Sequence, residues 1–235
     1  MPDTSALPKY IQVSEMLIRE IAAGHLADGA RLPPEREMAD DLGIAIGTLR
    51  KALADVAAKG LLQRRQGSGN YITHRPVVDS VYAFFRLELL RGGGLPTAEL
   101  LTVDRLAKPA GLPACGQADS GHRIRRLRLL DGQRVALEEI WLDGARADRI
   151  NPDELSESLY HYYRNALGIV IASVEDRISV GAAPDWSPPA FQLKRGQPCG
   201  YIERIGQTAD KANVEFSRTW FDGTHARYVS RMGKG

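Results

Sequence analysis

Residues 32–72 read LPPEREMADDLGIAIGTLRKALADVAAKGLLQRRQGSGNYI, and their pattern indicates how the first part of the chain folds. Its apolar residues recur three and four positions apart over residues 38–42 and again over 49–56, and residues 13–21 upstream show the same spacing. That spacing places apolar side chains on one face of a helix, so it predicts three short helices between residue 10 and about residue 62.

Glycine and proline mark the ends of these helices. Gly24, Gly43 and Gly60 each follow one of the periodic runs, and glycine adopts the left-handed cap conformation at the least cost. Pro33-Pro34 stands where the second helix should begin, a position that suits proline because the first helical N–H needs no partner within the helix. Residue type and periodicity therefore agree.

A short hairpin is predicted after the third helix. LLQRR (residues 61–65) and NYIT (70–73) have the composition of strands, and Gln66-Gly67-Ser68-Gly69 between them allows a tight reversal. Three helices followed by such a hairpin, or wing, are typical of a winged helix-turn-helix. In that fold the third helix enters the major groove of DNA, while the wing reaches the backbone or the minor groove.

The pattern changes beyond residue 73. His74-Arg75-Pro76 carries no periodicity, so we predict a linker over 74–79 that separates a winged domain, residues 1–75, from a second domain, residues 76–235. Helices are predicted over 80–90 and 155–167, and Asp131-Gly132 predicts a hairpin turn. Alternating segments predict strands over residues 100–106, 122–130, 134–142, 176–182, 198–207 and 213–222. A mostly antiparallel sheet with a few helices follows, so the fold class is α+β.

The composition excludes several classes of protein. With 235 residues, 43% hydrophobic and 26% charged, the chain is typical of globular proteins with one large or two small domains, and unlike disordered or collagen-like chains. It has no apolar run of the roughly 18 to 20 residues that span a membrane and no signal peptide, so we expect a cytoplasmic protein. Cys115 and Cys199 lack partners at metal-ligand spacing, so neither a metal nor another cofactor is predicted.

Net charge does not identify the DNA-binding half. The whole chain carries +2, and residues 1–75 hold ten basic and nine acidic side chains. Nucleic-acid binders concentrate their basic residues on one face, so placement must decide. Basic residues do surround the predicted third helix and wing, although any single one of them could be an ordinary solvated surface charge: Arg36, Arg50, Lys51, Arg64 and Arg65.

Residues 32–72 strongly resemble the DNA-binding domain of the GntR family of bacterial transcription regulators, through the ERE-A, T-R-AL and GL elements and the G-x-G wing. The resemblance implies that Arg36 and Arg50 contact DNA. Thr48, on the same predicted helix as Arg50, suits a hydrogen bond to a phosphate or a base edge. The other candidates for DNA contact are Lys51, Arg64, Arg65, Gln66 and Gly67.

The chain departs from that family at the start of the third helix. Where the family commonly has Ser-Arg, this sequence has Ala45-Ile46, which removes a capping hydroxyl and a guanidinium that contacts bases. We therefore expect an operator that differs from the usual family sequence. Pro34 replaces a frequent Ser or Ala and remains compatible with a helix N-terminus.

HRIRRLRLLDGQRVALEEIWL, residues 122–142, resembles the core hairpin of the effector-binding (UTRA) domain in the HutC-like branch of the family, whose fold is similar to chorismate lyase. Residues 158–171 and 213–228 are similar to later parts of the same domain, so the resemblance spans most of residues 80–230. It implies an antiparallel sheet domain with helices that binds a small effector.

Two arginines in the first strand of that hairpin are candidates for effector binding. Arg126 and Arg128 lie two residues apart and share one face, where paired guanidiniums can hold a phosphate or carboxylate, while Arg123 and Arg125 would occupy the opposite face. The resemblance implies that Arg126 and Arg128 point inward.

The resemblance adds Glu138 and Glu215 to this inward pair, as acceptors for effector hydroxyl, amide or amino groups. A buried ion-pair network that supports the sheet is an open alternative for all four residues. Ser158 and Tyr160 fall where the branch often places anion-contacting groups, although capping and core packing explain them equally well. Arg86 would add an anion contact.

These patterns together predict a homodimeric, ligand-responsive transcription regulator, more a repressor than an activator. It would bind double-stranded operator DNA as a two-fold dimer and be released by a small polar or anionic metabolite. No catalytic residue is predicted, since the five histidines show no catalytic motif. Two alternatives remain: a chorismate-lyase-like enzyme, which would not need a winged module, and a winged adaptor that binds protein, which would not explain the arginines at DNA-contacting positions.

Overall fold

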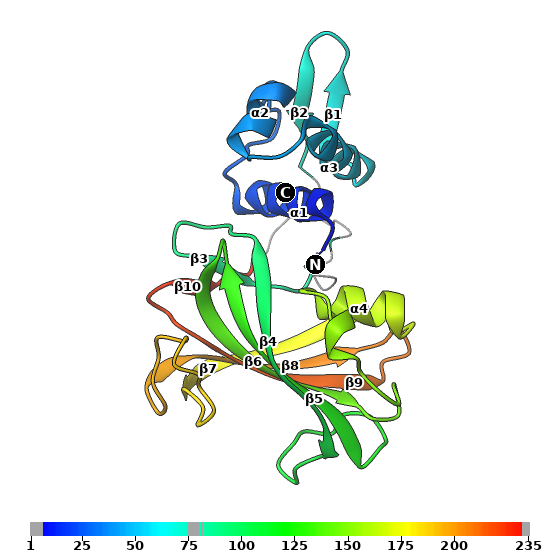
Figure 1. Ribbon diagram of the computed structural model, residues 1–235, viewed down its shortest axis with the longest axis vertical. Helices are drawn as coiled ribbons and strands as arrows, with labels where there is room; N and C mark the ends of the chain where they lie inside the picture. The colour runs from blue at the N-terminus through cyan, green and yellow to red at the C-terminus, as the bar shows by residue number, and fades with distance from the viewer. Residues whose placement is uncertain (1–6, 75–79, 81, 232–235) are drawn as a thin grey trace. The chain divides into compact units, whose positions relative to one another are not determined.

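The computed structural model describes residues 7–74, 80 and 82–231, which form two compact units (Figure 1). One unit is Leu7–Leu95 together with the chain from Val229, and the other is Pro96–Tyr228. Within the described residues the chain therefore passes between the units twice, after Leu95 and after Tyr228. A domain boundary near residue 75 stays a prediction, since residues 75–79 lie outside the described part. Among the described residues, no helix is long and apolar enough to cross a membrane.

The first unit contains the predicted winged helix-turn-helix. Each of the three helices is followed by a glycine in the left-handed conformation: Gly24 has φ 82°, Gly43 has φ 60° and Gly60 has φ 75°. Periodicity and cap residues thus place these helices correctly. The elements are α1 (Lys9–Ala23), α2 (Glu35–Asp41), α3 (Ile46–Ala58), β1 (Leu62–Arg65) and β2 (Gly69–Ile72).

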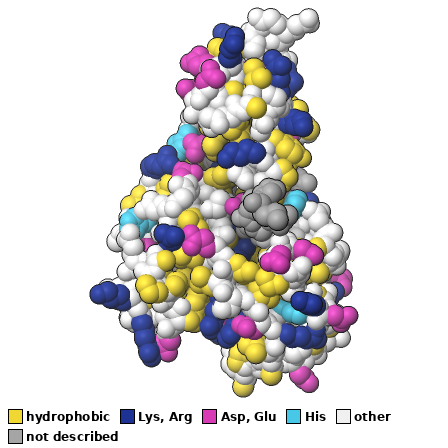
Figure 2. Space-filling model, viewed as in Figure 1, with side chains coloured by type: hydrophobic (Ala, Val, Ile, Leu, Met, Phe, Trp, Pro, Cys, Tyr) yellow, Lys and Arg dark blue, Asp and Glu magenta, His cyan; other side chains and the backbone are white. Residues whose placement is uncertain are grey.

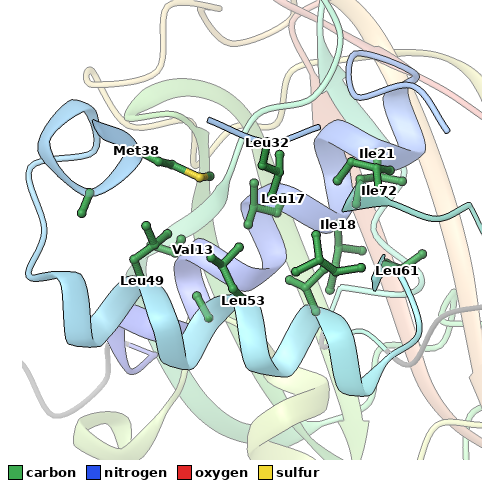
Figure 3. Close-up of a cluster of buried hydrophobic side chains, with 14 residues drawn as sticks. Val13, Leu17, Ile18, Ile21, Leu32, Met38, Leu49, Leu53, Leu61 and Ile72 are labelled. Atoms are coloured by element: carbon green, nitrogen blue, oxygen red, sulfur yellow. The ribbon is translucent and has the colours of Figure 1, made fainter. Parts of the chain in front are cut away.

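The apolar faces of the three helices meet in one core (Figure 3). Val13, Leu17 and Ile18 of α1 share this core with Leu49 and Leu53 of α3, and Met38 reaches it from α2. Leu53 is 1% exposed, so its truncation to alanine would cost about 2 to 5 kcal/mol of stability. This core fixes which side of α3 faces solvent.

The helix predicted over residues 80–90 is wrong. The described residues form a turn over 82–84 and the strand β3 (Leu87–Leu89). Tertiary contacts satisfy the backbone here: the guanidinium of Arg19 on α1 donates to the carbonyl oxygens of Leu87 and Gly94, each at 2.6 Å, and lies over the Phe85 ring. These contacts come from α1, a distant part of the chain, so tertiary structure overrides the local helical pattern of residues 80–90.

The second unit is built on a six-stranded antiparallel sheet of order β4-β5-β6-β9-β8-β7. All six predicted strands are confirmed, and the α+β class with them. The strands of the sheet are β4 (Pro96–Ala107), β5 (Ser120–Leu130), β6 (Gln133–Asp143), β7 (Ser173–Ala182), β8 (Pro198–Gln207) and β9 (Asn213–Phe221), and the unit also holds η1 (Pro152–Glu154), α4 (Leu159–Ala166) and β10 (Ala226–Tyr228).

Two local features of this unit bear on the site. Asp131 and Gly132 have φ 49° and 79°, the pair of left-handed residues that the predicted hairpin turn between β5 and β6 requires. The helix predicted over 155–167 begins later, at Leu159, because Ser158 caps it by accepting a hydrogen bond from the His161 backbone N–H. Helix α4 packs on one face of the sheet, where Tyr160 reaches Glu215 of β9.

Candidate functional site

One face of α3 is exposed and basic. The core takes the opposite face, so Arg50 and Lys51 are exposed and Thr48 is half-buried. Gly47 and Ala54, also exposed, add little bulk between these side chains. The helix can therefore approach another surface closely along this face. Figure 2 shows lysine and arginine side chains interspersed with acidic ones over the visible surface, in agreement with the low net charge.

Arg50 is oriented by a carboxylate of the neighbouring helix. Its Nε donates to Glu35 Oε2 at 2.7 Å, and its side chain remains 61% exposed. The hydrogen bond from Arg50 lowers the pKa of Glu35 below its ordinary value. Arg36, the next residue of α2, is exposed. The two predicted family contacts, Arg36 and Arg50, thus both lie on the surface of the winged unit.

The wing is ordered by its own side chains. Arg65 lies over the Tyr71 ring at 4.3 Å and donates to the side-chain oxygen of Gln63, while Gly67 at the tip has φ 73°. Arg64 donates to the backbone carbonyl of Arg50 at 3.4 Å, a long contact between the wing and α3. The structure therefore brings the predicted contacts on α2, α3 and the wing into one unit.

Arg31 was missed by sequence reasoning. It forms an isolated bridge with Tyr71 and so lies alongside β2 as a third extended segment. It lines a hollow of about 550 Å³ that Arg64, Arg65, Gln66 and Gly67 also line. Its position in an extended segment just before Pro33-Pro34 was the available signal, but extended segments carry no helical periodicity to draw attention to them.

The second candidate site lies on one face of the six-stranded sheet. Arg126 stands directly opposite Glu138 in the ladder, and Arg128, two residues on, shares that face as predicted. Arg126 donates to Glu138 Oε2 at 2.7 Å, and Arg128 Nε lies 3.6 Å from Glu138 Oε1. The Glu138 carboxylate therefore contacts the guanidiniums of both Arg126 and Arg128.

Both arginines also reach the chain just before α4. The backbone carbonyl of Glu157 accepts from Arg126 at 3.2 Å and from Arg128 at 2.8 Å. Burial alone would raise the pKa of Glu138, but the charges of Arg126 and Arg128 outweigh it and hold that pKa below its ordinary value. Glu138 is thus kept ionised between the two arginines.

Glu215 has the opposite electrostatic character. Its Oε1 accepts a hydrogen bond from the Tyr160 hydroxyl at 2.9 Å. Burial raises the pKa of Glu215 despite the hydroxyls of Tyr160 and Tyr163 and the charge of Arg204 nearby. Burial likewise raises the pKa of Tyr160 well above its ordinary value. Protonated Glu215 is therefore favoured more than it would be in water.

Arg204 and Asp176 extend the same face and were missed by sequence reasoning. Arg204 donates twice to Asp176, at 2.6 and 2.7 Å, and the Tyr228 hydroxyl donates to the same carboxylate at 2.8 Å. In the ladders Arg204 stands opposite both Asp176 and Ser217. The sequence did contain a signal, because Arg204 lies two residues after Ile202 on β8 and so shares its inward face. Only the order of the strands, however, shows that Arg204 lies near Glu215.

The two remaining predicted effector residues, Ser158 and Arg86, lie in different units. Ser158 acts as the cap of α4 and is 4% exposed. Arg86 belongs to the other compact unit, where it donates to the Ala83 carbonyl at 2.5 Å and lines a cavity of about 300 Å³. The sheet unit therefore holds Arg126, Arg128, Glu138, Ser158, Tyr160 and Glu215, whereas Arg86 belongs to the winged unit.

The opposite face of the sheet carries its own charges. Arg125 pairs with Glu139 at 2.7 Å and lies over the Trp186 ring at 4.6 Å, and Arg123 pairs with Asp104 at 2.8 Å. Their predicted orientation away from Arg126 and Arg128 is confirmed by the register. Cys115 and Cys199 are buried free thiols, and the residues described include no group of three His, Cys, Asp or Glu side chains placed to hold a metal ion.

Two protein-family models match the chain: residues 9–72 match the gntR family of bacterial regulatory proteins, and residues 92–227 match the UTRA domain. HTH-type transcriptional regulator SmoD of Agrobacterium fabrum is 58% identical over 227 residues, 97% of each chain. Histidine utilization repressor of Pseudomonas putida is 24% identical over 233 residues, 97% of this chain and 93% of that one.

A solved structure gives the same result for the fold. The crystal structure of possible transcriptional regulator YydK from Bacillus subtilis has a TM-score of 0.54 at 20% identity, with 97% of this chain and 100% of that chain covered. The gntR match falls on the winged unit and the UTRA match falls almost entirely on the sheet unit. The protein therefore belongs to the GntR family of DNA-binding transcription regulators, and its second domain is the UTRA domain found in HutC-like members.

Proposed function

We propose that this regulator is a cytoplasmic, homodimeric repressor that a small polar or anionic metabolite releases from its operator. The ligand would bind the inward face of the sheet, at Arg126, Arg128, Glu138, Tyr160 and Glu215. No catalytic reaction is assigned to the chain.

The observation that carries this proposal is the buried charge on that face. Arg126 Nε is buried and makes no hydrogen bond among the described residues, and buried polar groups normally find a partner. Burial favours the protonated form of Glu215, and the guanidiniums of Arg126, Arg128 and Arg204 then have Glu138 and Asp176 as their ionised carboxylate partners. An anion with a hydroxyl or amide group would supply both the missing negative charge and the missing hydrogen bond.

Release would follow from linkage between the two sites. A two-fold dimer would present two α3 helices to the half-sites of a pseudo-palindromic operator. A ligand that weakens operator binding must itself bind less tightly to the DNA-bound form. The predicted linker over 74–79 lies outside the described residues except for His74. We therefore assign the coupling between ligand binding and operator binding to the connection between the units as a whole.

The first experiment tests the DNA half of the proposal. Fragments of the source genome would be titrated with the full-length protein by fluorescence anisotropy. Arg50→Ala should then cost about 1 to 3 kcal/mol of specific operator affinity if Arg50 contacts a base edge. Unchanged operator binding at matched salt would remove Arg50 from the interface, and failure to bind any fragment would favour the protein-binding adaptor.

The second experiment tests ligand response. A thermal-shift screen would cover sugar phosphates, phosphonates and histidine-pathway acids, and each compound that raises the melting temperature would be added to the operator titration. We expect at least one compound to raise the melting temperature and to weaken operator binding. Compounds that raise the melting temperature but leave operator binding unchanged would contradict ligand-driven release.

A further inference from the structure

The first turn of α3 exposes an apolar side chain. Ile46 is 38% exposed, and among the described residues of the winged module, 7–74, it is the one large hydrophobic side chain that is exposed. Ala45 before it makes no side-chain cap. An exposed isoleucine at the start of a helix gains nothing from solvent, so its burial against a partner would be favourable.

The neighbours of Ile46 leave its approach to a partner open. Arg50 lies four residues on and therefore on the same side of the helix, whereas Leu49 is fully buried. At Gly47, the next residue, an added Cβ would meet nothing within 4 Å, so the surface of the helix is open at that position. Ile46 and Arg50 therefore lie side by side on the exposed face of α3, near its N-terminus.

The chemistry of the major groove selects the partner of this side chain. The N-terminal residues of a recognition helix contact base edges. Ile46 can neither donate nor accept a hydrogen bond, so placing it against guanine or cytosine would bury polar base atoms without partners. Thymine alone presents an apolar group in the groove, its C5-methyl.

We infer that Ile46 contacts the C5-methyl of a thymine and thereby sets a preference for a T·A pair at one position of each operator half-site. This inference rests on operator binding through α3. Burial of one methyl against Ile46 is worth about fourfold in affinity per half-site, from about 0.8 kcal/mol per buried carbon and 1.4 kcal/mol per factor of ten. Arginine at this position would instead favour guanine.

The experiment removes one methyl at a time from the DNA. The operator that the full-length protein enriches from random duplexes would be resynthesised with each thymine replaced singly by deoxyuridine, which keeps the base pair and loses only the methyl. For the wild-type protein we expect about a fourfold loss at one position of each half-site. For Ile46→Ala that position should show no loss, because the methyl no longer has a partner.

Two further variants make the result specific. Lys51→Ala, on the same face, should weaken binding to every duplex while keeping the deoxyuridine effect. Ile46→Arg should shift the enriched base at that position from thymine to guanine. Because Ile46 is exposed, the melting temperatures of both Ile46 variants should match that of the wild type, which would be checked first.

The outcomes separate this inference from operator binding itself. A deoxyuridine effect that persists unchanged in Ile46→Ala, or no effect at any thymine while Arg50→Ala still weakens operator binding, would overturn the role of Ile46 and leave DNA binding through α3 intact. A wild-type protein that enriches no duplex would overturn operator binding instead.

Discussion

Arg128 is the residue at which a ligand site and a structural ion-pair network differ most clearly. It is 2% exposed, donates to the Glu157 carbonyl and lies near Glu138. Removing one partner of a buried pair is usually costly because it leaves the other charge uncompensated. Here Glu138 would keep its shorter contact with Arg126 at 2.7 Å, so its charge would not be left alone.

We therefore expect Arg128→Ala to stay a folded protein with a melting temperature near that of the wild type, to bind its operator, and to lose the response to ligand. Thermal unfolding and operator titrations, each with and without ligand, would be measured on one preparation. The matched control is Arg125→Ala on the same strand: Arg125 faces the opposite side, and its partner Glu139 keeps Arg218 nearby. A large fall in melting temperature with an intact response would assign Arg128 to the structural network.

Glu215 allows a prediction about pH. Burial raises its pKa in the folded protein above the ordinary value, so folding favours the protonated form. The stability that this carboxyl contributes is fully present below the unfolded pKa of about 4.3 and is lost as pH rises through the folded pKa.

Glu215→Gln removes this titration but keeps an oxygen that can accept from Tyr160. Relative to the wild type, the variant should therefore become more stable as pH rises from below about 4.3 toward neutrality. Urea unfolding of both proteins at a series of pH values would measure the difference. A difference that does not change with pH would show that Glu215 titrates alike in the folded and unfolded chains.

At the scale of elements, the segment between the winged module and the sheet shows where local signals end. Helices α1, α2 and α3 follow from periodicity and glycine caps, which act within a few residues. The segment over 80–95 instead takes its conformation from Arg19, whose partners Leu87 and Gly94 lie 68 and 75 residues away in the sequence. A helical pattern in residues 80–90 could not reveal that donor.

Arg19 should therefore matter for communication between the units. Arg19→Met keeps much of the side-chain length but removes both hydrogen bonds. A hydrogen bond from a charged donor contributes at most about 1.5 to 3 kcal/mol to stability. We expect a less stable winged unit in which ligand weakens operator binding less than in the wild type, because the segment that leads to Leu95 is no longer fastened to α1. Operator titrations with and without ligand would measure the ratio of dissociation constants. Lys9→Met, at the exposed start of the same helix, should keep the wild-type ratio, and an unchanged ratio in Arg19→Met would show that coupling bypasses this segment.

At the scale of the whole molecule, ligand release and operator binding must obey one coupling free energy. If the ligand weakens operator binding by a given factor, typically about 5 to 150, operator DNA must weaken ligand binding by the same factor. Calorimetric ligand titrations of the free protein and of the protein saturated with operator would give the second factor, and anisotropy would give the first. Unequal factors would mean that the ligand acts through a third state, such as dissociation of the dimer, which analytical ultracentrifugation of the same samples would detect.

The winged helix-turn-helix, the six strands, the Asp131-Gly132 turn and the shared face of Arg126 and Arg128 could all be predicted from the amino-acid sequence alone. Each of these depends on spacings of two to four residues or on the backbone preference of single residues, which any stretch of chain carries with it. The fold of the whole chain was needed to show that Arg204 and Asp176 join that face and that Arg86 belongs to the other compact unit. The reason is that strand order in the sheet β4-β5-β6-β9-β8-β7 sets which distant residues meet, and no local spacing encodes that order.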